Sequence, residues 1–307
     1  MKEIVLAGGT GHLGQLLKTA FVKRGNKVII LTRGEKKSRH PLIQYVQWDG
    51  KHLGAWTKEL EEADALVNLS GERIDKRFTK ENKILLTKSR IEPTLVLGEA
   101  ISQLSHPPNV WINFSGVSIF EGVNSISDEY NRQYGHGFLA DLTKKWEEAF
   151  YKYDLLHTKR KILRVSPVLT PTEGLFASLY PLAKWGLAGT IGSGKQYMPW
   201  VHHEDFVRIV HWLVDGHAKQ TIYHACVPHA VNNKQFMRAL RRAAGSRVGI
   251  PLPALFAKIG AYLKGLDPSL LFGSTPVVSK ALVDEGFEFN YTDPGKAFSQ
   301  LRNLTLQ

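Results

Sequence analysis

The chain has 307 residues, of which 43% are hydrophobic and 22% charged, a composition typical of a globular protein. It contains no run of about 18 apolar residues that could span a bilayer. The first predicted strand starts near Lys2 and leaves no room for a signal peptide, so we expect a soluble, cytoplasmic protein with no membrane partner. The length indicates one large domain with a smaller appended module.

The cysteine count and the net charge exclude several kinds of site. Cys226 is the only cysteine, which excludes an intramolecular disulfide, a thiolate zinc site and an iron–sulfur cluster, and we expect it to be buried and unreactive. A net charge of +12 favours capture of a phosphate-rich ligand. Basic segments such as Lys76–Arg90 and Lys234–Arg247 lack the interleaved aromatic residues of a single-strand groove, so nucleic-acid binding is not indicated.

Residues 3–31 have the pattern of a strand, a glycine turn, a helix and a second strand. Glu3–Ala7 and Lys27–Leu31 predict buried strands, and Gln15–Arg24 predicts a helix with one apolar face. The turn carries Gly8, Gly11 and Gly14. Glycines at this spacing permit a tight bend and bring a pyrophosphate close to the start of the helix. An ordinary strand-to-helix turn is the alternative, but the length of about 30 residues is that of a βαβ unit and favours the phosphate.

The end of the second predicted strand indicates which dinucleotide would bind. An acidic residue about 20 positions past the glycines would bind the ribose 2′-hydroxyl of NAD. The chain instead has Thr32 and Arg33 there, and a guanidinium can bind the 2′-phosphate of NADP through two hydrogen bonds. We therefore predict NADP(H) as the cofactor. A solvated basic loop is the alternative, since Lys36, Lys37 and Arg39 lie close by, and the nearby Glu35 counts against a site for the 2′-phosphate.

The remaining pattern predicts an α/β fold. Strands are expected at 44–47, 65–68, 110–114, 161–165 and 221–225, and helices at 80–104, 138–153 and 204–214, near 234 and 253, and as a terminal pair. This alternation predicts a Rossmann-type doubly wound parallel sheet. We assign residues 1–165 to the NADP-binding domain, with 203–230 returning to it, and residues 166–202 and 231–307 to a smaller C-terminal substrate module.

Small or polar residues follow several predicted strands, where open α/β sheets bind their ligands. Asp49 could accept a hydrogen bond from an adenine amino group or form an ordinary Asx turn. Small residues after the fourth strand would let a cofactor approach the backbone. This stretch consists of Leu69, Ser70 and Gly71. Ser115 ends the fifth strand and is a candidate for contact with both cofactor and substrate.

The motifs together resemble those of an atypical extended short-chain dehydrogenase/reductase, in the branch labelled epimerase family protein. The resemblance runs from end to end and rests on AGGTGHLG with LTR, NLSGE, TKSRIEPT, FSG, FLADLTKKWEEA, ILRVSPVL, GSGKQYMPWVHHED and SKALVDEGFEFNYTDP. It implies a Rossmann fold with a small C-terminal domain and a small-molecule substrate that it does not identify. We add Thr10, His12 and Leu13 of the turn, Thr32 and Arg164 to the cofactor-binding residues.

The chain departs from the parent family in its catalytic residues. In that family the strand-five serine acts with a Tyr-x-x-x-Lys pair on the following helix. Alignment on Trp-Glu-Glu-Ala at 146–149 puts Leu139 and Thr143 at the tyrosine and lysine positions. A Tyr-x-x-x-Lys string at Tyr180 and Lys184 lies after the sixth strand and is expected by chance.

Substitutes could come from the polar loop after the fifth strand, which holds Ser118, Asp128, Tyr130 and Tyr134. The branch pattern points to Glu129 of this loop for proton transfer, and Ser115 and Glu129 are our catalytic candidates. A solvated surface acid is the alternative for Glu129. Arg164 could orient an anionic substrate group or form a structural ion pair.

A group of histidines with an acid raises the question of a metal site. It comprises His202, His203, His211 and Asp205. His202 and Asp205 fit a helix-start pattern of the family, in which an acid caps backbone donors, so we predict no metal.

We therefore expect an NADP(H)-binding protein that performs hydride chemistry as an oxidoreductase or nucleotide-sugar epimerase-type enzyme. The first alternative is a non-enzymatic NADP(H)-dependent regulator or scaffold that kept the cofactor site without the Tyr and Lys pair. The second is a basic nucleic-acid-associated member of the same fold. The oligomeric state is left undecided, with a homodimer among the alternatives.

Overall fold

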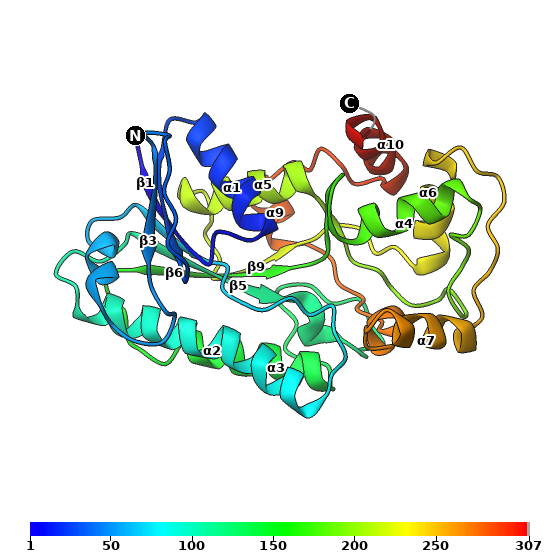
Figure 1. The fold of residues 1–307 in the computed structure, drawn as a ribbon, viewed down its shortest axis with the longest axis horizontal. Coiled ribbons are helices and arrows are strands. Elements are labelled where there is room, and N and C mark those ends of the chain that lie inside the picture. Colours follow the sequence, from blue (N-terminus) through cyan, green and yellow to red (C-terminus); the bar gives the residue numbers. More distant parts are fainter. Residues whose placement is uncertain (306–307) are drawn as a thin grey trace.

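The computed structural model describes residues 1–305, which form a seven-stranded parallel sheet with helices on both faces and a smaller helical module at one end (Figure 1). The strands are β1 (Glu3–Ala7), β2 (Lys27–Thr32), β3 (Ile43–Gln47), β4 (Ala65–Asn68), β5 (Val110–Gly116), β6 (Lys159–Val165) and β9 (Ile222–Ala225). Their order is β3-β2-β1-β4-β5-β6-β9, and every neighbouring pair is parallel. The predicted doubly wound sheet is confirmed, with its switch point between β1 and β4.

Successive side chains of each strand point to opposite faces of the sheet, so the apolar residues form two cores. On one face, Ile4 and Leu6 of β1 pack with α1 (His12–Lys23) and α5 (His203–Val214). On the other face, Val5 and Ala7 pack with α2 (Lys80–Gln103) and α3 (Phe138–Phe150). Figure 1 shows these two helices on the opposite side of the sheet from α1 and α5. Burial on both faces explains why the strands are near-continuous apolar runs.

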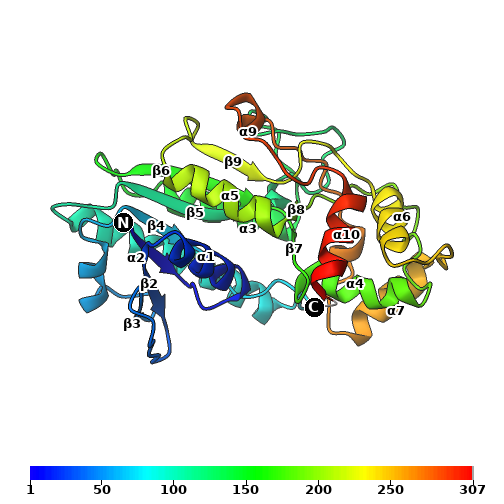
Figure 2. The ribbon, with the colours of Figure 1, turned by 90° about the horizontal axis from the view of Figure 1, so that it is seen from above.

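The helical module has its own core beyond the carboxyl ends of the strands (Figure 2). Its helices are α4 (Gly174–Lys184), α6 (Asn233–Ala243), α7 (Ala254–Leu263), α8 (Ser269–Phe272) and α10 (Pro294–Thr305). Phe176 of α4 stacks on Phe298 of α10, whose ring meets Phe236 of α6 edge-on. The sequence pattern did not predict α4, which contains Pro181, and the Tyr180–Lys184 string lies on this helix with Tyr180 in the module core.

The remaining elements are short. They are β7 (Val168–Leu169), paired with β8 (Val201–His202), α9 (Ala281–Asp284), and the 3₁₀ helices η1 (Ala55–Leu60) and η2 (Val117–Phe120). Ala281, Leu282 and Phe287 pack in the sheet core with α1 and α5, although they lie far along the chain. Cys226 is buried, and burial raises the pKa of its thiol, which stays protonated. Among the described residues, no helix is both long and apolar enough to cross a membrane.

A buried polar group joins the central strands to the helices on one face. The side-chain amide of Asn68 donates to Asn113 Oδ1 at 2.7 Å and to Thr94 Oγ1 at 3.1 Å. The indole N–H of Trp146 also donates to Thr94 Oγ1, at 2.9 Å, and the Thr94 hydroxyl donates to the Arg90 carbonyl. The Thr94 hydroxyl therefore links β4, α2 and α3, and Asn68 Oδ1 in turn accepts from the backbone N–H of Ser70 at 3.1 Å.

Replacing Thr94 by Val should lower the free energy of unfolding by about 2 kcal/mol, because the buried Trp146 indole N–H loses its acceptor and Asn68 loses one of two. The matched control is Thr87→Val on the same helix, whose more exposed hydroxyl donates to the Lys83 carbonyl. The control should change stability by less than about 0.5 kcal/mol. Urea unfolding measures both, and equal effects would contradict the role given to Thr94.

Candidate functional site

The glycine turn between β1 and α1 leaves no room for a side chain at Gly8 or at Gly14. Gly8 has a φ of +73°, and a Cβ added there would lie 2.9 Å from the Ser70 Cα atom. A Cβ on Gly14 would lie 2.3 Å from the Gly9 carbonyl oxygen. Gly11 differs, because no heavy atom lies within 4 Å of a Cβ added to it. The turn is therefore tight on its inner side and open at Gly11.

The open side of the turn presents hydrogen-bond donors. Gly11 is the N-cap of α1, and no side chain within residues 1–305 caps the backbone N–H groups of the first turn. The hydroxyl of Ser70 is buried beside Gly8 and lacks a partner in the same part of the chain. Uncapped N–H groups at a helix N-terminus and an orphaned hydroxyl fit the oxygens of a pyrophosphate.

The end of β2 lies next to this turn, because the Gly8 N–H donates to the Leu31 carbonyl at 3.1 Å. Thr32 is buried, and its carbonyl accepts from the Trp48 N–H. The Arg33 side chain that follows is 79% exposed, and its Nη2 atom lies 3.7 Å from Glu72 Oε1. Such an exposed pair is weak, so the guanidinium can turn to a ligand phosphate at this edge.

Asp49 forms the Asx arrangement that the sequence left open. Its Oδ1 atom accepts from the backbone N–H groups of Lys51 and His52, and its Oδ2 atom lies 2.6 Å from His52 Nδ1. Bonds from the His52 backbone and ring, and from Lys51, hold the pKa of Asp49 well below its usual value. Contact with an adenine amino group stays a prediction.

The other residues predicted to bind the cofactor lie around the turn, and each makes its own contacts with the protein. The His12 ring is 2.9 Å from Thr170 Oγ1 and 3.3 Å from a carboxylate oxygen of Glu173, so it joins the turn to the start of α4. Leu13 packs against the sheet core. A Cβ on Gly71 would lie 3.2 Å from the guanidinium of Arg90, which donates to the Glu72 carbonyl. Thr10 is half-buried in the turn, and its carbonyl is 3.3 Å from Gln15 Nε2.

Ser115 belongs to a second polar group at the carboxyl ends of β5 and β6. Its hydroxyl donates to Glu147 Oε1 at 2.6 Å. Arg164, the β6 neighbour of Ser115 in register, donates to the same carboxylate through Nε and Nη2, each at 2.8 Å. Arg164 is fully buried, so its charge depends on Glu147. The structure favours the ion-pair alternative for Arg164, and its contact with a ligand stays a prediction.

Glu147 is the residue of this group that the sequence did not single out. It lies on the buried face of α3 together with Thr143 and Trp146. A carboxylate on the apolar face of an amphipathic helix, opposite an arginine in a buried strand, is the signal that could have identified it. The guanidinium of Arg164 also lies 5.3 Å from the ring of Tyr134 and donates to its hydroxyl at 3.3 Å.

Glu129, the expected proton-transfer group, is buried and makes contacts of a structural kind. One carboxylate oxygen accepts from the His224 N–H and the Ser279 hydroxyl, and the other from the N–H groups of Lys280 and Ala281. These four bonds tie the polar loop to β9 and to the start of α9. A role in proton transfer stays a prediction that these contacts do not support.

The positions aligned with the parent tyrosine and lysine are buried on α3. The Thr143 hydroxyl donates to the Leu139 carbonyl at 2.7 Å and lies 3.1 Å from the Ser118 hydroxyl. Tyr130 of the polar loop is exposed, and its hydroxyl is 3.4 Å from Asp284 Oδ2. Tyr134 is therefore the loop phenol that reaches the Ser115–Glu147–Arg164 group.

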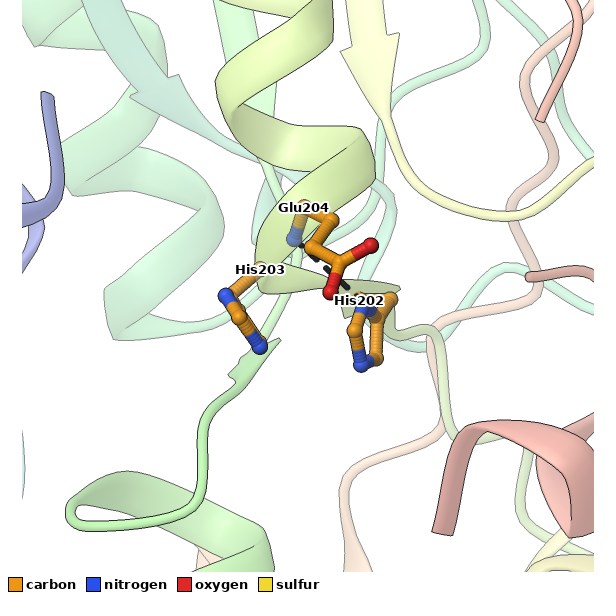
Figure 3. Close-up of side chains that lie close together, drawn as sticks. All are labelled: His202, His203 and Glu204. Atoms are coloured by element: carbon orange, nitrogen blue, oxygen red, sulfur yellow. Dashed lines mark hydrogen bonds between the residues drawn. The ribbon is translucent and has the colours of Figure 1, made fainter. Parts of the chain in front are cut away.

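The histidines near the start of α5 form a close cluster with Glu204 (Figure 3). His202 Nδ1 accepts from the Glu204 backbone N–H at 3.3 Å, and His202 Nε2 lies 2.9 Å from Gln300 Oε1. Burial, with His203 nearby, lowers the pKa of His202 to about 3, so the ring is neutral and both nitrogens are engaged. Asp205 accepts from the backbone N–H groups of Asn290 and Tyr291. These contacts connect α5 to the chain around α10.

Comparisons with known sequences give matches along the whole chain. Residues 4–140 match the model of the NAD dependent epimerase/dehydratase family. The chain is 28% identical over 304 residues to an epimerase family protein of Staphylococcus haemolyticus, which covers 98% of this chain and 99% of that protein. It is 27% identical over 305 residues to the human epimerase family protein SDR39U1, with 97% and 99% covered.

Solved structures share the fold described above. The structure of human SDR39U1 with NADPH has a TM-score of 0.86 at 24% identity and covers 98% of this chain and 99% of that chain. UDP-N-acetylglucosamine 4-epimerase from Bacillus cereus has a TM-score of 0.75 at 17% identity, with 100% and 97% covered. The resemblance seen in the motifs is thus confirmed. Over its whole length the chain is similar to epimerase family proteins, and its first 140 residues match the NAD dependent epimerase/dehydratase family from residue 4 onward.

Proposed function

We propose that this protein binds NADP(H) at the glycine turn and performs hydride chemistry on a small molecule, as an oxidoreductase or epimerase-type enzyme. The observation that carries the proposal is the convergence of uncapped N–H groups, the open space at Gly11 and the orphaned Ser70 hydroxyl. The NADPH in the solved human relative supports the choice of cofactor. A cytoplasmic location stays a prediction.

One group of residues would bind the cofactor, and a second group would bind the substrate and transfer a proton. The glycine turn and Ser70 would hold the pyrophosphate, and Arg33 the 2′-phosphate. NADPH, when bound, supplies a hydride. Ser115 would bind a substrate oxygen, and its hydroxyl could pass a proton to or from Glu147, whose orientation Arg164 fixes by two hydrogen bonds.

The buried side chains of α3 favour a second candidate function. Because Leu139 and Thr143 cannot transfer protons as a tyrosine and lysine do, the chain could bind NADP(H) without turnover, as a regulator or scaffold.

For the enzyme hypothesis, nucleotide sugars are a substrate class to test first, since a structural relative is a UDP-N-acetylglucosamine 4-epimerase.

Gly11→Ala should leave the unliganded protein folded, because the added methyl group meets no atom within 4 Å. The same methyl group would enter the space of a pyrophosphate, so NADPH should raise the Tm of this variant much less than that of the wild type. Thermal unfolding with and without NADPH measures both. An undiminished NADPH shift in Gly11→Ala would place the cofactor elsewhere.

Arg33→Asp should reduce the preference for NADPH over NADH by about tenfold or more, because a charge-assisted contact to the 2′-phosphate contributes about 1.5–3 kcal/mol. Titration of both dinucleotides by fluorescence measures the preference. The control is Lys23→Asp, an equal charge reversal on an exposed residue at the other end of α1. Equal losses in the two variants would show a general charge effect and contradict the role of Arg33.

Ser115→Ala should lower kcat/KM by about 100-fold in NADPH oxidation, because the substrate oxygen loses its hydrogen-bonding and proton-transfer partner. The assay uses a panel of carbonyl compounds and sugar nucleotides. Glu147→Gln should act in the same direction, with the exposed neighbour Glu148→Gln as matched control. NADPH binding by the wild type without any turnover on the panel would favour the regulator.

Glu129→Gln separates structural from catalytic roles in the same assay. It should lower the free energy of unfolding, because four hydrogen bonds lose a charged acceptor, and leave turnover per folded molecule unchanged. A loss of turnover at full stability would instead support proton transfer by Glu129.

A further inference from the structure

The positive charge of the chain is concentrated in two segments without acidic residues. Residues 174–203 and 216–266 contain ten Lys and Arg and no Asp or Glu, against a net charge of +12 for the whole chain. Most of both segments belongs to the helical module, including α4, α6 and α7. The glycine turn, by contrast, has Glu72 and Glu173 close by. The basic charge of this protein is therefore mainly a property of the module.

Four arginines of these segments surround one cavity. It has a volume of about 500 Å³ and is lined by Arg238, Arg241, Arg242, Gly245, Ser246 and Arg247. Within residues 1–305 none of the four guanidinium groups is in an ion pair, and Arg238, Arg242 and Arg247 are exposed. Arg241 is held in place by a bond from Nη1 to the Ala188 carbonyl at 3.0 Å. This arrangement suits anionic groups supplied from outside the chain.

Helix α7 turns its large apolar side chains outward. Leu255, Phe256, Ile259 and Leu263 are 47–79% exposed, whereas Ala257 and Ala261 on the opposite side are buried. An amphipathic helix that covers a core does the reverse. Both views show α7 at an edge of the module (Figures 1 and 2), and its last turn meets the chain before α2, where Arg77 donates to the Tyr262 carbonyl.

The segment that leads into α7 lies beside both the arginines and the exposed apolar residues that follow α4. Arg241 packs against Gly249, where an added Cβ would lie 2.3 Å from its side chain. The Ile250 N–H donates to the Gly186 carbonyl at 2.9 Å, which aligns residues 248–250 with 185–187. We define the apolar face as the exposed side chains of Trp185, Leu187, Val248, Ile250, Leu255, Phe256, Ile259 and Leu263. Trp185 is 82% exposed and has the size and polarity found at membrane interfaces.

We propose that the apolar face, with the four arginines beside it, docks this protein onto the surface of a bilayer that contains anionic phospholipids. The apolar side chains would enter the boundary between headgroups and acyl chains, and the arginines would bind phosphates. A second copy of the chain is a poor occupant, since a symmetric contact would bring two acid-free surfaces together. The expectation of no membrane partner rested on the lack of a long apolar run, which surface docking does not need.

The test is co-sedimentation of the full chain with vesicles of phosphatidylcholine, with and without phosphatidylglycerol. Binding should require phosphatidylglycerol and weaken at high salt. Arg238→Glu/Arg242→Glu should lower the partition coefficient by about 25-fold or more, because one basic residue near such a surface contributes about fivefold. The exposed pair Lys88→Glu/Lys145→Glu, on α2 and α3, makes the same charge change and should have little effect.

Leu255→Gln/Phe256→Gln tests the apolar half of the proposal. Both side chains are exposed, so the unfolding transition should be retained while vesicle binding is lost. On binding, Trp185 emission should shift to shorter wavelength, and Trp185→Phe should remove the shift.

Three results would overturn the proposal. The first is equal binding to neutral vesicles or equal losses in the control pair. The second is no vesicle binding at low salt, with or without binding of soluble polyphosphate. The third is a wild-type protein that forms a dimer in solution and does not bind vesicles, together with a Leu255→Gln/Phe256→Gln variant that is monomeric.

Discussion

One contact, between the glycine turn and the end of β4, shapes the edge of the sheet at which we propose that the cofactor binds. Gly8 adopts a positive φ and leaves no room for a side chain against Ser70. Because β1 pairs with both β2 and β4, the ends of three strands meet beside the turn. The close approach also leaves the Ser70 hydroxyl buried without a partner in the described chain, beside an uncapped helix start. Polar groups that the protein does not satisfy internally favour a ligand that can.

Two buried polar groups follow one another along the strand ends, and their chemistry differs. Around Thr94 and Asn68 the groups are neutral and pair with one another, so they fix the sheet to its helices. Around Glu147 and Arg164 the groups are charged, and a buried charge is stable only while its partner is present. Ser115 joins the second group at the carboxyl end of β5, on the edge of the sheet that also holds the glycine turn. Glu147 and Arg164 form an ion pair of a kind that elsewhere would only stabilise the fold, and here it lies next to a candidate catalytic residue.

The distribution of charge changes the meaning of the high isoelectric point. Composition alone indicates that a net charge of +12 favours the capture of a phosphate-rich cofactor. The structure puts much of that charge on the helical module, next to exposed apolar side chains of α7. Near the turn the charges are mixed, and Arg33 is an exposed cation beside it. Cofactor specificity therefore depends on the placement of single residues, and the net charge describes a different surface.

The sequence by itself determined the sheet, the glycine turn and the residues at the strand ends, because strand periodicity, glycine spacing and chain order are local properties. It could not determine α4, whose Pro181 resembles a helix breaker until packing against α6 and α10 outweighs local preference. Nor could it give the partners of Glu129 and Glu147, which lie far apart in the chain. Only the tertiary structure decided that Glu129 binds backbone groups of β9 and α9 while Glu147 joins Ser115 to Arg164, because burial leaves each carboxylate only the donors that folding brings to it.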